Sequence, residues 1–91
     1  MASPIFAFPN PARLSAAPAV EISGVPRGGS VDIVTPAGRR VTTIAAAEAG
    51  GGWRWRLVSR ADRAVAPGIY LAVVRDGGSQ VVQTLRLAVR R

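Results

Sequence analysis

The side chains of this sequence that could support catalysis or metal binding are few. The chain contains no histidine and no cysteine, so acid–base chemistry and metal binding would fall to five carboxylates. These are scattered over predicted strands and turns, unlike the clustered carboxylates of a calcium loop. A serine nucleophile would lack the histidine that usually activates it. We therefore expect no catalytic residue, no metal site, no cofactor and no enzyme activity. The five carboxylates are Glu21, Asp32, Glu48, Asp62 and Asp76.

Two of these carboxylates, Glu21 and Asp32, lie on predicted neighbouring strands and could face each other. Each alternates with apolar residues, so we expect both to be solvated positions on the outer face of a strand. The glycine-rich stretches at 28–29, 50–52 and 77–78 do not indicate phosphate loops. None of them stands between a strand and the start of a helix with a following Lys-Ser/Thr.

The segment Trp53-Arg54-Trp55-Arg56 places two aromatic side chains on one face of a predicted strand and two arginines on the other. Aromatic rings on an exposed sheet can stack bases, and arginines can hold phosphates. These residues are therefore the candidates for nucleic-acid contacts. A small sandwich also needs large side chains in its core, and Leu57 continues the tryptophan face. We favour buried tryptophans with Arg54 and Arg56 facing solvent.

The charge of the chain permits attraction to polyanions without demonstrating it. The net charge is +7, carried by twelve arginines and no lysine. The exclusive use of arginine, together with abundant alanine, glycine and valine, indicates a compositional bias. We expect any binding to nucleic acid to be nonspecific and driven by phosphate attraction.

Apolar residues alternate with polar ones in short runs bounded by Gly, Pro, Asn and Asp, which is typical of short strands. The fold class predicted is all-β, an antiparallel Ig-like or fibronectin-like β-sandwich of about seven short strands. Asp76-Gly77 predicts a hairpin between the last two strands. The run at 69–75 is apolar on both faces, so we expect a central strand covered on each side. The predicted strands are 4–8, 18–23, 30–35, 40–46, 53–58, 69–75 and 80–89.

The length of 91 residues fits a single domain spanning residues 1–91. Within it, residues 1–17 are expected to form a loosely attached N-terminal strand and a proline-rich lead-in. No apolar run approaches the roughly 20 residues of a transmembrane helix. The apolar run at 5–8 is too short for a signal peptide. The residues predicted to build the core are Trp53, Trp55, Tyr70, Leu71, Leu85 and Leu87.

Three stretches together resemble a known type of module. They are Phe8-Pro9-Asn10-Pro11-Ala12, then 31–35 followed by 37–41, then Trp53-Arg54-Trp55 followed by 65–71. Their content and order are similar to Ig-like modules at the C-termini of many secreted bacterial proteins. Those modules are the type 9 secretion C-terminal sorting domain and its relative, the Ig-like domain of flagellar hook-capping proteins. The sequence departs from the family at Trp55-Arg56-Leu57, where Trp-Asp-Gly is common.

The resemblance implies a noncatalytic C-terminal module of an exported or cell-surface protein that acts in sorting, anchoring or assembly. Its implied partners are proteins, either secretion or surface-anchoring machinery or further copies joined through strand edges. The implied location is extracellular or at the cell surface. In other Ig-like sandwiches a residue like Tyr70 bonds its hydroxyl to nearby backbone, although Tyr70 is equally consistent with an ordinary buried aromatic. Two alternatives stay open, a filament subunit built by strand pairing and a basic nucleic-acid-binding β-domain.

Overall fold

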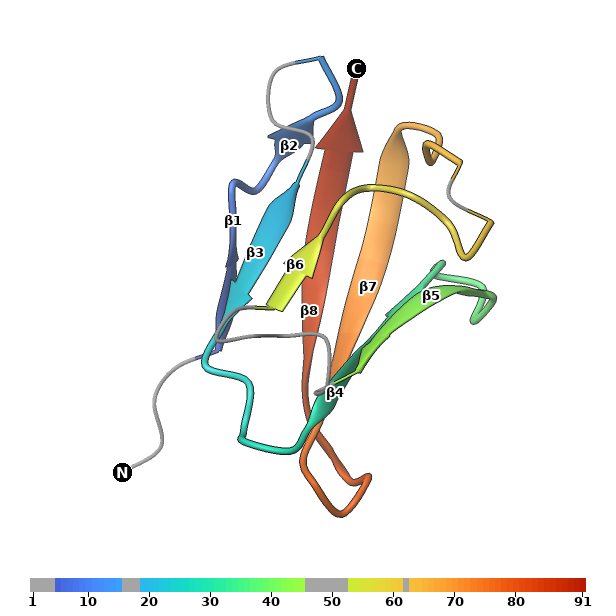
Figure 1. The fold of residues 1–91 in the computed structure, drawn as a ribbon. Coiled ribbons are helices and arrows are strands. Elements are labelled where there is room, and N and C mark those ends of the chain that lie inside the picture. The colour runs from blue at the N-terminus through green and yellow to red at the C-terminus, as the bar shows by residue number, and fades with distance from the viewer. Residues whose placement is uncertain (1–4, 16–18, 46–52, 62) are drawn as a thin grey trace.

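The chain folds as two β-sheets packed face to face (Figure 1). The structure is a computed structural model and describes residues 5–15, 19–45, 53–61 and 63–91. Within those ranges all regular structure is strand. The smaller sheet has the strand order β1-β3-β6, and the larger has the order β2-β8-β7-β4-β5. The strands are β1 Phe6–Phe8, β2 Ala12–Arg13, β3 Val20–Ser23, β4 Ser30–Val34, β5 Arg40–Ala45, β6 Trp53–Trp55, β7 Gly68–Arg75 and β8 Val81–Arg90.

The all-β sandwich predicted from the sequence is confirmed, with eight strands in place of about seven. The additional strand is β2, two residues long, in the proline-rich lead-in. It pairs in parallel with β8, while all other strand pairs are antiparallel. Two residues carry no alternating pattern, so the sequence had no means of revealing this strand. β1 pairs with β3, so both described strands of the N-terminal segment are joined to the body of the sandwich.

Some predictions fall on residues outside the described ranges. They include the outermost positions of the strands predicted at 4–8, 18–23 and 40–46, the glycines at 50–52, and two of the carboxylates, Glu48 and Asp62. The strand predicted over 53–58 ends earlier, at Trp55. Leu57 has a positive φ of 60°, and this left-handed conformation cannot continue a strand.

The core lies between the two sheets and is filled mainly by side chains that point inward from the strands. Trp55 is the largest side chain that is fully buried, at 2% exposed. Its ring meets that of Tyr70 edge to face, with ring centroids 5.4 Å apart, an arrangement that aromatic quadrupoles favour. Both polar tips are satisfied, because Trp55 Nε1 donates to the Val58 carbonyl at 2.9 Å and the Tyr70 hydroxyl to the Ala66 carbonyl at 2.6 Å. The buried core residues are Ala12, Val20, Ile22, Val31, Ile33, Trp55, Leu57, Tyr70, Ala72, Val74, Leu87 and Val89.

Strand β7 lies between β8 and β4, as expected for a central strand. Its inward Tyr70, Ala72 and Val74 are buried, while the residues on the other face are half-buried. The expectation that both faces are covered is therefore corrected, since the second face has no covering layer among the described residues. Leu71, expected in the core, lies half-buried on this outer face because Tyr70 and Ala72 occupy the inward positions.

The hairpin predicted at Asp76-Gly77 joins β7 to β8. The Asp76 carboxylate accepts hydrogen bonds from the amides of Gly78 and Gln80, at 2.9 and 3.0 Å. The Asp76 amide donates to the Gln80 carbonyl at 2.9 Å. These bonds hold the loop closed and account for Asp76 as a turn residue.

Candidate docking surface

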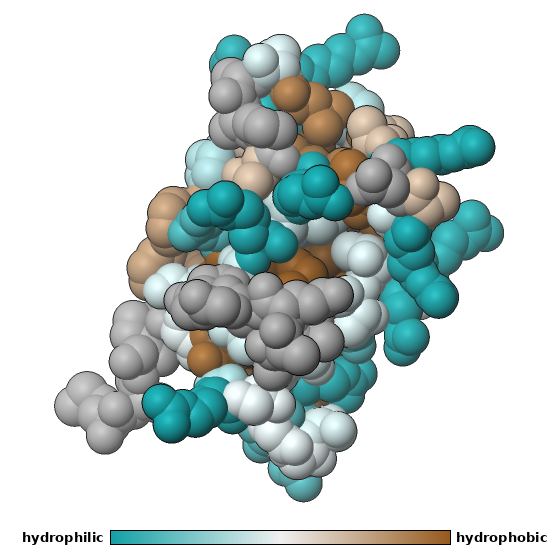
Figure 2. Space-filling model, in the orientation of Figure 1, coloured by the Kyte–Doolittle hydropathy of each residue, from teal (hydrophilic) through white to brown (hydrophobic). Residues whose placement is uncertain are grey.

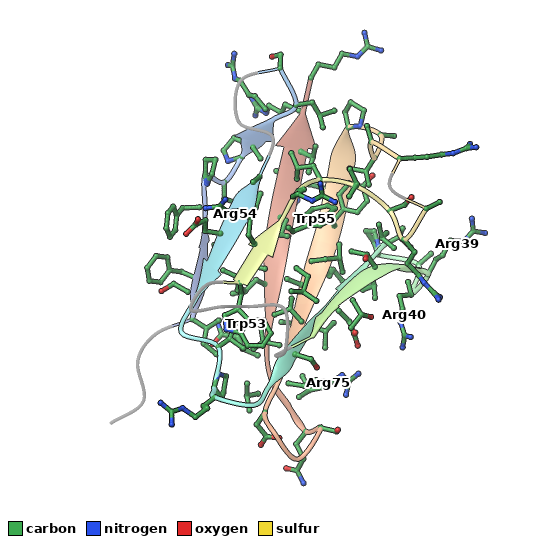
Figure 3. The ribbon with its side chains drawn as sticks, viewed as in Figure 1. Arg39, Arg40, Trp53, Arg54, Trp55 and Arg75 are labelled. Carbon is green, nitrogen blue, oxygen red and sulfur yellow. The ribbon has the colours of Figure 1, made fainter. Side chains whose placement is uncertain are left out.

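The tryptophan and arginine segment of β6 does not form an exposed stacking platform. Trp55 is buried, and Trp53 is half-buried against the core. Arg54 points to the outer face of the small sheet, where it is paired with Glu21 (Figure 3). Arg56 is exposed. A nucleic acid would therefore meet the arginine side chains of this segment and not the faces of its tryptophan rings.

The exposed arginines are spread over the molecule and do not form one patch. Arg39 and Arg40 project from the β4–β5 side of the molecule (Figure 3). Hydrophilic side chains cover the same side in Figure 2. Dispersed arginines supply a general attraction for polyanions but no base-reading geometry.

Glu21 and Asp32 lie in different sheets and do not face each other. Glu21 stands in solvent as expected, with Arg54 donating to its Oε1 from Nε at 3.1 Å and from a terminal nitrogen at 2.5 Å. The prediction that Asp32 is solvated is wrong, because this residue is only 7% exposed. Its carboxylate accepts hydrogen bonds from Thr43 Oγ1 at 2.8 Å and from Arg75 Nε at 3.2 Å. β4 runs between β5 and β7, so neighbouring side chains cover Asp32 on both sides.

No group of three or more His, Cys, Asp or Glu that could hold a metal ion occurs among the described residues. The same part of the chain also lacks a helix long and apolar enough to cross a membrane.

The edge of β8 that faces away from β7 is closed along its C-terminal half. β2 pairs with the last residues of the strand, and the Asn10 side chain takes the place of a strand next to them. Asn10 Nδ2 donates to the Arg86 carbonyl at 2.8 Å, and Asn10 Oδ1 accepts from the Ala88 amide at 3.0 Å. The pairing register with β7 shifts next to Arg75, near the other end of β8. Short edges, side-chain covers and bulges are the devices that hinder strand addition.

The opposite edge of the large sheet, β5, is also interrupted. The Arg60 amide donates to the Val41 carbonyl at 3.0 Å, so the segment after β6 covers part of this edge. The register between β4 and β5 shifts at Ile33/Val34. The two sheet edges are therefore poorer docking surfaces than their lengths suggest.

The outer face of the large sheet combines aliphatic side chains with arginines. Half-buried aliphatic side chains line its middle, with exposed arginines on either side. The strand register places Arg86, Leu71, Val34 and Arg40 in one row across β8, β7, β4 and β5. Neither Arg86 nor Arg40 forms an ion pair with another described residue. We call this surface the open face; its aliphatic residues are Val34, Ile69, Leu71 and Val73.

The remaining residues predicted from sequence are distributed between core and periphery. Leu87 is buried, and Leu85 is half-buried and packs on the core. Exposed large hydrophobic side chains occur instead on β1 and at the start of β8. The sequence showed these residues as strand positions but could not show which strand ends lie beyond the cover of the other sheet.

Comparison with known proteins gives one informative likeness. No protein-family model matches the chain, and no curated protein sequence matches it. A solved structure, that of PorZ from Porphyromonas gingivalis, is similar with a TM-score of 0.78 and 29% sequence identity. PorZ is described as an essential bacterial surface component of the type IX secretion system. The similarity covers 96% of this chain but 11% of PorZ.

The chain is thus similar to a small β-domain of a much longer secretion-system component. This finding agrees with the type 9 secretion part of the sequence resemblance. It supports a β-domain related to that system, and the Ig-like subtype stays an expectation.

Proposed function

We propose that this chain is a noncatalytic module of an exported or cell-surface protein, acting through protein partners in sorting, anchoring or assembly. The observation that carries the proposal is the likeness to part of PorZ across 96% of the chain. The composition supports it, because a chain without histidine or cysteine has few groups for catalysis. Its partners would be the secretion or surface-anchoring machinery.

A reporter fusion tests the sorting role. A reporter with its own signal peptide, carrying this chain at its C-terminus, is expressed in a bacterium with a type IX system. We expect the reporter at the cell surface, detected by protease accessibility on intact cells. The controls are the reporter without the module and the same fusion in a host that lacks the secretion system. Retention of the intact, folded fusion in the periplasm would contradict sorting, as would surface delivery in both hosts.

A filament subunit joined by strand pairing is the second candidate. The exposed Val81 and Val82 at the start of β8 favour it, since an apolar edge can pair with another chain. Asn10 and β2 close the rest of that edge, so less of it is available for pairing. We therefore rank the filament subunit second. Sedimentation velocity separates the two, because a filament subunit would grow in mass with concentration and Val82→Lys would abolish the growth.

A further inference from the structure

The open face is more apolar than an ordinary solvent-facing sheet surface. β7 reads Ile-Tyr-Leu-Ala-Val-Val, a composition typical of strands that are buried on both faces. The inward positions meet that expectation, with Ala72 and Val74 fully buried. The outward Ile69, Leu71 and Val73 are left half-buried. A sheet whose second face is partly apolar can pack a further element of secondary structure on that face.

The arginines on either side give the open face a definite width. Arg86 on β8 and Arg40 on β5 are separated by three strand spacings, which is about 14 Å. An α-helix with its side chains is about 10–12 Å across. A helix lying over β7 and β4 would therefore cover the aliphatic residues and bring its two flanks close to the arginines.

The ion pair between Arg75 and Asp32 lies at one end of the open face, next to Val73. Arg75 would add a third positive charge beside Val73, but its guanidinium is held by Asp32 and also donates to the Ser79 carbonyl at 3.2 Å. The carboxylate of Asp32 is itself satisfied by Thr43 and Arg75. The unneutralised charge next to the aliphatic residues is thus that of the flanking arginines.

We propose that the open face binds an acidic amphipathic helix of a protein partner. The helix would set a stripe of leucine, isoleucine or valine on Leu71, Val73 and Val34. Aspartate or glutamate on both sides of that stripe would pair with Arg40 and Arg86. The inference rests on the proposed function in one respect, namely that the module acts through protein partners.

Charge disfavours a second copy of this chain as the occupant. Each copy carries a net charge of +7, and face-to-face packing of two open faces would bring arginines against arginines. Like charges across an interface oppose association. A foreign helix with acidic flanks removes this repulsion and covers the same aliphatic surface.

A designed peptide tests the proposal directly. The probe is a fluorescein-labelled helical peptide of about 18 residues, or five turns, with leucines along one stripe and glutamates on both sides. We expect saturable binding by fluorescence anisotropy, and none for the same peptide with lysine in place of glutamate. The double variant Arg40→Glu/Arg86→Glu should weaken binding about tenfold or more. The matched control is Arg27→Glu/Arg63→Glu, which changes two exposed arginines in the β3–β4 and β6–β7 connections and alters the net charge equally; it should change binding little.

Amide chemical shifts then locate the peptide. Peptide-induced shifts should centre on β7 and β4 and disappear with Leu71→Asp, while an unchanged far-ultraviolet circular dichroism spectrum and unchanged tryptophan emission report that this variant is folded. The proposal is overturned if the wild type does not bind the glutamate peptide, if the double variant binds it as well as the wild type does, or if the shifts centre on the small sheet. Peptide binding and surface delivery of the reporter are separate readouts. Periplasmic retention of the wild-type fusion refutes the sorting role alone, and loss of peptide binding refutes the helix site alone.

Discussion

The two sheets use the same pair of chemical groups in different ways. In the small sheet, Glu21 and Arg54 pair in solvent, with 43% and 62% of their side chains exposed. In the large sheet, Asp32 and Arg75 pair with 10% and 35% exposed, and Thr43 completes the carboxylate's partners. An exposed pair contributes little to stability, whereas a covered carboxylate depends on its partners. The ion pair of the large sheet is therefore partly covered, whereas that of the small sheet is exposed to solvent.

Removing a strand from each sheet should give the largest contrast. Deleting residues 80–91 removes β8, which lies between β7 and β2 and supplies the buried Leu87 and Val89. We expect this deletion to unfold the domain outright, with loss of the β signal in circular dichroism. Deleting residues 1–8 removes only β1, whose phenylalanines are exposed, and should leave a cooperative unfolding transition. Removing only Arg90 and Arg91 should also leave the domain folded. A folded chain without residues 80–91 would contradict the central role of the large sheet.

Trp55 is the largest of the buried inward side chains of the small sheet, which also include Val20 and Ile22 of β3. Trp55→Ala should lower the free energy of unfolding by about 3–5 kcal/mol, because Trp55 is fully buried and packs on Tyr70. Trp53→Ala should cost less, since Trp53 is half-buried. Urea denaturation followed by far-ultraviolet circular dichroism measures both. Equal losses would show that the small sheet is packed more uniformly than its burial suggests.

The two ion pairs can be compared by matched substitutions. Asp32→Ala should cost about 1–3 kcal/mol, because it leaves Arg75 and Thr43 without their shared acceptor. Glu21→Ala should cost less than about 1 kcal/mol, as for other exposed pairs. Double-mutant cycles with Arg75 and Arg54 isolate each coupling. If the two couplings are equal, burial does not distinguish the two sheets.

High pH should weaken the contact between the sheets. Burial raises the pKa of the Tyr70 hydroxyl above its ordinary value of 10.0. The unfolded chain then loses this proton before the folded chain does, so the associated stability is present below pH 10 and is lost as the pH rises through the folded-state pKa. Tyr70→Phe should remove this pH dependence and cost about 1 kcal/mol for the bond to Ala66. An unchanged alkaline transition in Tyr70→Phe would assign the loss to other groups.

The smallest expected effect concerns nucleic acid. Binding of duplex DNA or RNA should be weak, independent of sequence and steeply reduced by salt, because dispersed arginines attract phosphate only. Arg54→Gln with Arg56→Gln should change it no more than replacing two arginines elsewhere, such as Arg39 and Arg63. Filter binding at several salt concentrations measures this. A sequence-selective complex that persists at physiological salt and is lost in the Arg54 and Arg56 variant would overturn this expectation.

The sequence revealed those features of the fold that depend on alternation along one strand. Seven strands and the Asp76-Gly77 hairpin follow from local pattern and turn chemistry. β2 was missed because two residues have no period. The burial of Asp32 was missed because it depends on Thr43 and Arg75, which are distant in sequence.

The candidate site depends on register, which local pattern does not contain. Arg40 and Arg86 are 46 positions apart, from their residue numbers, and become neighbours of one aliphatic row only through three strand pairings. The one local signal was the two-sided apolar character of β7. It predicted cover on both faces, and the structure shows which face is open.

The bond between Asn10 and β8 affects the order in which the fold can form. Asn10 and β2 lie near the start of the chain, while their partners Arg86, Ala88 and Val89 lie near its end, 76 positions from Asn10 to Arg86. Contacts this distant in sequence form late and slow the folding of β-domains. During synthesis, the first strands must wait for β8 to leave the ribosome before the large sheet can be completed. The large sheet is therefore completed only when β8 is available and β2 and Asn10 can pair with it.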